Sequence, residues 1–170
     1  MIHARMSAEI PVVIRDARVP MEIPLVRALF DEYAASLGVD LSFQDFAREL
    51  AELPGGYAAP RGCLLVADIG GEIVGCVALR ALAADEPQGE IKRLYLRPAA
   101  RGRGLGRDLV QAVITRARSL GYRMLKLDTL ASMQSARTLY ASLGFRACAP
   151  YYRNPLPGTS YMDLALDVRD

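Results

Sequence analysis

The sequence predicts a single α/β domain built on a mixed β-sheet, and three observations lead to this fold class. A chain of 170 residues can form one substantial core but is too short for two ordinary domains. Strand-like and helix-like patterns alternate over residues 11–170 in the order βααβββαβαββ. A predicted strand at 90–96, a glycine-rich loop at 101–106 and a helix at 105–120 follow one another. This is the arrangement of a crossover connection between parallel strands.

The N-terminal half is predicted to contain a strand, two helices and a hairpin. Residues 1–10 look like an extension, so the domain is taken as 11–170. Ser42 looks like the N-cap of the second helix. Gly70-Gly71 is a strong signal for a tight hairpin turn. The predicted elements are the strand 11–15, the helices 19–37 and 43–53, and the strands 63–69 and 72–82.

The C-terminal half is predicted to follow the glycine-rich loop with two helices and three strands. Gly121 and Gly144 suit the ends of the two helices, because glycine readily adopts the left-handed conformation found there. An aromatic loop at 151–158 precedes the last strand. The predicted elements are the helix 105–120, the strand 123–128, the helix 135–143, and the strands 145–148 and 161–167.

Composition excludes several classes of function. The net charge of +2 is too small to predict a nucleic-acid binder, which needs a large basic face. No apolar stretch approaches the roughly 20 residues of a membrane span, and no signal-peptide pattern is present. The one histidine, His3, and the widely spaced Cys63, Cys76 and Cys148 predict no metal site and free, buried or half-buried thiols. We therefore expect a cytoplasmic protein.

The loop at 101–106 predicts a phosphate-binding site. Glycines at 102, 104 and 106 let the backbone approach a ligand closely, and the N–H groups at a helix start favour anions. Arginines at 101, 103 and 107 add positive charge. A solvated surface turn is the alternative. A dinucleotide fingerprint fits less well, because Arg107 stands where its third glycine would be and the loop comes late in the chain.

At this point the sequence resembles the GNAT N-acetyltransferase superfamily. Arg101, Gly104 and Gly106 match the acetyl-CoA motif Gln/Arg-x-x-Gly-x-Gly/Ala. The strand 90–96 and the run 139–145 are similar to further family signatures. The resemblance covers the chain from about residue 11 and implies a GNAT-like three-layer fold, with a mixed, mostly antiparallel central sheet flanked by helices. One departure is Met133, which stands where many members have an asparagine that contacts the cofactor in some of them.

The resemblance implies that acetyl-CoA is the acyl donor and that no metal takes part. It implies that Leu94 and Leu96 offer backbone hydrogen bonds to the pantetheine arm, and that an N–H near Leu94 stabilises the oxyanion. The residues implied to bind the cofactor are Leu94, Tyr95, Leu96, Arg101, Gly102, Arg103, Gly104, Leu105, Gly106, Arg107 and Ala136.

The resemblance also implies two catalytic residues. It places the Tyr140 hydroxyl near the sulfur of coenzyme A, where it can protonate the departing thiolate; a core tyrosine is the alternative. Glu90 stands where several members have a general base; a charge paired with Lys or Arg is the alternative.

The acceptor is less well defined, and a primary amine on a small molecule is the first expectation. Tyr33, Arg80, Tyr152 and Arg153 are the candidate acceptor-binding residues, and Arg153 suits a carboxylate. A protein lysine or N-terminus, a larger acyl donor, and a non-catalytic acyl-CoA-binding module remain alternatives. Many members dimerise, so a homodimer is a further expectation.

Overall fold

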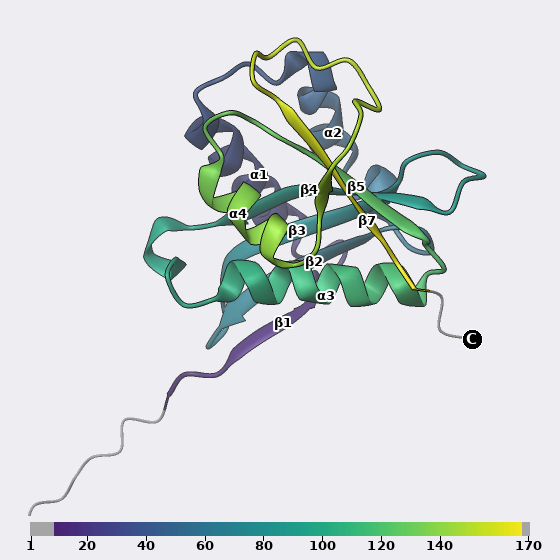
Figure 1. The fold of residues 1–170 in the computed structure, drawn as a ribbon. Helices are drawn as coiled ribbons and strands as arrows, with labels where there is room; N and C mark the ends of the chain where they lie inside the picture. Colours follow the sequence, from purple (N-terminus) through teal and green to yellow (C-terminus); the bar gives the residue numbers. More distant parts are fainter. Residues whose placement is uncertain (1–8, 168–170) are drawn as a thin grey trace, which may run out of the picture.

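A seven-stranded sheet with the order β1-β2-β3-β4-β5-β7-β6 forms the centre of the fold, in a computed structural model that describes residues 9–167 (Figure 1). The strands are β1 (Val12–Asp16), β2 (Cys63–Ile69), β3 (Glu72–Ala81), β4 (Gln88–Leu96), β5 (Met124–Thr129), β6 (Arg146–Ala147) and β7 (Ser160–Ala165). The α-helices are α1 (Ile23–Leu37), α2 (Phe46–Glu52), α3 (Leu105–Ser119) and α4 (Gln134–Ser142), and the 3-10 helices are η1 (Ser42–Gln44), η2 (Gly55–Tyr57) and η3 (Pro98–Ala100). Among these strands, only β4 and β5 pair in parallel. The predicted mixed, mostly antiparallel sheet is confirmed.

Helices cover both faces of the sheet, and each face has its own apolar cluster. Along β2, Cys63 and Leu65 pack in the cluster under α3, whereas Leu64 and Val66 pack in the cluster under α1. Because both faces are covered, β2 is a continuous apolar run instead of an alternating one. The three layers position the site described below, which lies where the central layer opens.

The sheet opens between β4 and β5. These strands pair only from Gln88–Met124 to Glu90–Lys126, although β4 continues to Leu96 and β5 to Thr129. On its other side, β4 shows a register shift against β3, and Arg93 has a φ of 60° there. A β-bulge of this kind bends a strand and ends its pairing. The bulge therefore separates β4 from β5 over the last residues of both strands.

Two helices begin three or four residues later than predicted. The helix predicted from residue 19 begins at Ile23, because Pro24 occupies its first turn and residues 19–22 form a turn. Ser42 does not cap an 11-residue helix: its N–H and hydroxyl donate to the carboxylate of Asp40. Residues 42–44 form η1 instead, and Asp45, with a φ of 56°, separates it from α2. Residues 1–8 of the predicted extension lie outside the described residues.

Candidate functional site

Three neighbouring cavities lie along the opening between β4 and β5 and share lining residues. The loop groove, of about 590 Å³, lies between Leu94–Leu96, the loop at 102–106 and the start of α4. The inner chamber, of about 20 Å³, contains Tyr140 and Asp128. The outer cleft, of about 600 Å³, lies between η1, β3 and the loop at 151–152. Tyr33 and Leu94 line both the groove and the chamber, and Gln44 and Lys92 line both the chamber and the cleft.

The loop groove presents a row of free backbone donors. Within residues 9–167, the N–H groups of 102–107 donate to no protein acceptor. Gly102 and Gly104 each have a φ of 78°, and no protein atom lies within 4 Å of where a Cβ would stand at either residue. Both glycines therefore turn the loop while leaving its surface open to a ligand. Free N–H groups at a helix start, together with the helix dipole, form an anion-binding site.

The three arginines of the loop are exposed and differ in their contacts. The Arg101 Nε donates to the Leu96 carbonyl at 2.9 Å, and its guanidinium lies over the Tyr95 ring. The Arg107 Nη2 donates to the Ser142 hydroxyl at 2.7 Å. Only Arg101 lines the groove. Arg103 and Arg107, which the resemblance implied as cofactor-binding residues, are exposed and do not line the groove.

Two tyrosines line the inner chamber: Tyr140 is buried and Tyr33 is half-buried. Tyr140 comes from α4 and packs edge-on against Phe145 with ring centroids 5.4 Å apart, while Tyr33 comes from α1 on the other face of the sheet. Burial raises the pKa of both phenols above the usual value near 10. Each phenol therefore keeps its proton at neutral pH, and within residues 9–167 the Tyr140 hydroxyl has no hydrogen-bond partner.

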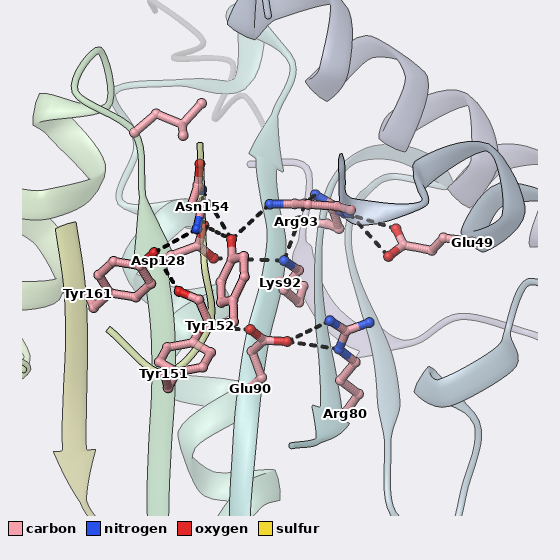
Figure 2. A network of polar contacts seen from close by, with 12 residues as sticks. Glu49, Arg80, Glu90, Lys92, Arg93, Asp128, Tyr151, Tyr152, Asn154 and Tyr161 are labelled. Carbon is pink, nitrogen blue, oxygen red and sulfur yellow. Dashed lines mark hydrogen bonds and ion pairs between the residues drawn. The ribbon is translucent and has the colours of Figure 1, made fainter. Parts of the chain in front are cut away.

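Three ion pairs lie side by side next to the chamber and the outer cleft (Figure 2). Arg80 binds Glu90 at 2.8 Å, and Arg93 binds Glu49 at 2.9 Å. Lys92 and Asp128 are 3.8 Å apart. Burial lowers the pKa of Lys92, and the neighbouring Glu90 and Asp128 oppose this shift. The three positive and three negative groups thus balance one another in a largely buried region, where an unpaired charge would be costly.

Gln44 joins these pairs to the aromatic loop. Its Oε1 accepts from Arg93 at 2.9 Å, and its Nε2 donates to the Tyr152 hydroxyl at 3.1 Å. The Tyr152 hydroxyl in turn donates to the Asp128 carboxylate at 2.6 Å. The break at Asp45 ends η1 at Gln44, and the side chain of Gln44 reaches the bulge of β4. The network therefore connects η1, β4, β5 and the loop at 151–154.

The predicted catalytic residues lie in different cavities. Tyr140 lines the inner chamber, whereas Glu90 lines the outer cleft. The Glu90 carboxylate accepts from Arg80 on one oxygen and from the Tyr151 hydroxyl, at 2.6 Å, on the other. Glu90 therefore has the arginine partner that the alternative interpretation expected, although it is only 2% exposed.

The predicted binding residues are only partly brought together. The loop groove is lined by the cofactor candidates Leu94, Tyr95, Leu96, Arg101, Gly102, Gly104, Leu105, Gly106 and Ala136. Among the acceptor candidates, Arg80 and Tyr152 line the outer cleft, and Tyr33 lines the groove and the chamber. Arg153 is exposed and lines none of these cavities. Met133 lines the groove and the chamber at the position of the family departure.

Sequence reasoning missed Gln44, Lys92, Arg93 and Asp128 as parts of the site. One signal was present: Lys92 and Arg93 are consecutive charges inside a strand that also had to be buried. Asp128 was noticed only as a possible nucleotide-binding acid. Gln44 gave no signal, because its position depends on the break between η1 and α2.

Other features of residues 9–167 bear on the predicted absences. No helix there is long and apolar enough to cross a membrane, and no three His, Cys, Asp or Glu side chains form a group that could hold a metal ion. The three cysteines are free, as predicted. Burial raises the pKa of the Cys63 thiol to about 11 and that of Cys76 to about 12.

Comparisons with known proteins agree with this geometry. The family model described as "Acetyltransferase (GNAT) family" matches residues 26–145. A Schizosaccharomyces pombe protein described as an uncharacterized N-acetyltransferase is 40% identical over 150 residues, which cover 88% of this chain and 91% of that protein. A Klebsiella pneumoniae structure, provisionally assigned as an acyl-CoA N-acyltransferase, is 28% identical with a TM-score of 0.71 and covers 92% and 98% of the two chains. A Salmonella typhimurium structure solved with acetyl-CoA is 22% identical and has a TM-score of 0.67, and the match covers 93% of this chain and 95% of that one. It shares the fold.

Proposed function

Because the chain belongs to the GNAT family of acetyltransferases, we propose that it transfers an acetyl group from acetyl-CoA to a primary amine of a small molecule. The amine attacks directly while both substrates are bound. The observation that carries this proposal is the order of the three cavities: the chamber lined by Tyr140 shares wall residues with the loop groove on one side and with the outer cleft on the other. Two substrates can enter from opposite ends and meet at the chamber.

The loop groove fits the donor in shape and in chemistry. When bound, acetyl-CoA supplies an activated acetyl thioester. The free N–H groups of 102–107 donate hydrogen bonds to the pyrophosphate of the coenzyme, and the side chains of Arg101, Arg103 and Arg107 neutralise its charge. From Ile91 onward, the edge of β4 that faces β5 lacks a strand partner there, so its backbone can hydrogen-bond an extended chain. The N–H near Leu94 is the proposed oxyanion donor.

Tyr140 is the proposed proton donor to the leaving thiolate. Its hydroxyl is protonated at neutral pH and free of protein partners within residues 9–167, and it lies in the chamber where groove and cleft meet. A phenol that is protonated at neutral pH can donate to the sulfur as negative charge develops there.

Two carboxylates are candidates for receiving the proton of the amine. Glu90, the residue expected from the resemblance, is held on both oxygens by Arg80 and Tyr151. Asp128 lies in the same chamber as Tyr140. This location favours Asp128 as the direct acceptor, with Glu90 acting on charge and orientation in the outer cleft.

The small-molecule acceptor is favoured over a protein by the boundaries of the outer cleft. The hydrogen bond between Gln44 and Tyr152 joins η1 to the aromatic loop, and both residues line the cleft. This contact limits the width of the cleft, which suits a small acceptor better than a peptide. A peptide bound in an open form of the cleft, or a larger acyl donor, is the second candidate, and a panel of acyl-CoA donors and peptide acceptors tests it.

Calorimetric titration with acetyl-CoA tests the donor site. We expect saturable one-site binding to the wild-type protein and its loss in Gly104→Val, because a side chain there projects into the groove and strains the backbone. Gly121→Val is the matched control: Gly121 also has a positive φ, of 85°, and open space around it, but lies at the far end of α3. No binding at millimolar acetyl-CoA would overturn the proposal.

A further inference from the structure

The pair formed by Lys92 and Asp128 is looser than its two neighbours. The Nζ of Lys92 and the Oδ1 of Asp128 are 3.8 Å apart and share no hydrogen bond. The adjacent pairs, Arg80 with Glu90 and Arg93 with Glu49, close to 2.8 and 2.9 Å. Greater exposure to solvent does not explain the gap, because the side chains of Lys92 and Asp128 are only 5% and 8% exposed, whereas that of Arg80, in one of the closer pairs, is 39% exposed.

Each partner of the loose pair keeps unused hydrogen-bonding capacity. Lys92 is 6% exposed and has three N–H donors, yet it makes one long hydrogen bond, of 3.4 Å, to Gln44. Asp128 receives Tyr152 and Asn154 on Oδ2, while Oδ1 accepts no hydrogen bond within residues 9–167. Buried charges are normally hydrogen-bonded. The capacity left at Lys92 and at Oδ1 therefore points to a ligand with both a negative and a positive group.

The two charges are ordered along the path of the acceptor. Asp128 lines the inner chamber together with Tyr140. Lys92 lines both the chamber and the outer cleft. A ligand entering from the cleft thus meets the lysine at the boundary and the aspartate further inside, next to the proposed site of acetyl transfer.

We propose that the acceptor is a free amino acid, with its ammonium group at Asp128, its carboxylate at Lys92 and its side chain in the outer cleft. This inference rests on the proposed acetyltransferase function and names its substrate class. Phe43, Leu82 and Tyr151 supply apolar wall to the cleft, and Arg80 supplies a charge. A protein N-terminus fits less well, because its first carbonyl is a neutral amide that would leave Lys92 without an anion.

The protons and bonds of the reaction balance with these residues. Asp128 takes one proton from the ammonium group, which leaves a neutral amine, and later releases that proton to solvent. The N–C bond forms, the C–S bond breaks, and Tyr140 gives its proton to the departing sulfur. The second proton lost by the nitrogen restores Tyr140. The sum is an N-acetyl amino acid, free coenzyme A and one proton.

Each free proteinogenic amino acid is first compared with its carboxamide on the wild-type enzyme, by release of the coenzyme A thiol from acetyl-CoA. The carboxamide keeps the amine but lacks the charge that Lys92 is proposed to bind. The amine of the carboxamide also has a lower pKa, so a larger fraction of it is neutral and nucleophilic at neutral pH. A preference for the acid therefore cannot come from a larger supply of neutral amine. We expect kcat/KM for at least one acid to exceed that of its amide by about tenfold or more, the scale of one charge-assisted hydrogen bond.

Binding is then measured without turnover, by calorimetric titration of that acid and its amide into the enzyme saturated with coenzyme A. Lys92→Met is expected to weaken the acid by about tenfold or more and to leave the amide nearly unchanged. Lys126→Met is the matched control: Lys126 lies on β5, with its ammonium over the Tyr151 ring and outside the three cavities. It should change neither Kd.

The outcomes separate this inference from the proposed function. Acetyl-CoA binding without acetylation of any amino acid, or amides that equal the acids, would overturn the amino-acid inference alone. An equal loss for acid and amide in Lys92→Met would overturn the role of Lys92. Absence of acetyl-CoA binding would instead overturn the proposed function. If Lys92→Met does not fold, the comparison of acid with amide on the wild-type enzyme still decides the substrate class.

Discussion

The guanidinium of Arg93 is bound by the carboxylate of Glu49, with Nε and Oε2 2.9 Å apart, and this contact ties α2 to the bulge of β4. Arg93 has a φ of 60°, a conformation that is unfavourable for a residue with a long side chain. The guanidinium is buried, and its Nη1 donates a further hydrogen bond to the Oε1 of Gln44. The bulge that separates β4 from β5 is therefore maintained by side chains from a distant part of the chain.

Replacing Glu49 by glutamine should destabilise the protein and impair the site. The change leaves the buried Arg93 without its anion, and removing one partner of a buried pair costs about 3 kcal/mol of unfolding free energy. Denaturant unfolding measures this loss. Glu52→Gln, which breaks an exposed pair with Arg48 on the same helix, should have little effect. Similar stability for the two variants would contradict the role of Glu49.

Tyr140→Phe should keep acetyl-CoA binding and lower kcat by at least about tenfold, because the ring remains and only the proton donor is lost. Calorimetry measures the binding, and thiol release measures kcat. Tyr122→Phe is the matched control, since Tyr122 is also buried but donates to the Arg61 carbonyl away from the three cavities. Tyr122→Phe should lower the stability of the protein and leave kcat unchanged. Unchanged kcat in Tyr140→Phe would remove Tyr140 from the mechanism.

Asp128→Asn and Glu90→Gln should differ in their pH–rate profiles. If Asp128 receives the proton, its amide variant should lose about 100-fold in kcat and the acidic limb of the profile. Glu90→Gln should change mainly KM and keep the limb, because Glu90 lies in the outer cleft with Arg80. The reverse result would assign proton transfer to Glu90, as the sequence resemblance implied.

Glu22 should make stability depend on pH in acid. Its hydrogen bonds with Arg15 lower its pKa to about 2. A depressed carboxyl pKa stabilises the folded state above the unfolded pKa, near 4.3 for glutamate, and this contribution is lost as the pH falls toward about 2. Between about pH 6 and pH 2, the melting temperature should therefore fall less steeply for Glu22→Gln than for the wild-type protein. Thermal unfolding at a series of pH values measures this. Glu86→Gln, at an exposed position, should follow the wild type.

Local sequence patterns were sufficient to predict the order of the elements and most of the residues that line the loop groove. The hairpin at Gly70-Gly71, the strand at 90–96 and the glycine loop before α3 depend on neighbouring residues, so they can be predicted from the sequence. The lining of the loop groove follows directly, because its residues lie in one strand, one loop and one helix start. The family resemblance extended this to Tyr140.

The lining of the inner chamber and the outer cleft was decided by tertiary structure alone. Gln44, Lys92 and Asp128 come from three separate segments, and they meet only because Asp45 breaks the helix predicted over 43–53 and the bulge opens β4 from β5. A charge inside a strand can point into a core or into a cavity, and its sequence is the same in both cases. The sequence by itself determined the glycine loop before α3, since a backbone loop is local. Which charges line the inner chamber depends on pairings between distant residues, and only the folded chain fixes those.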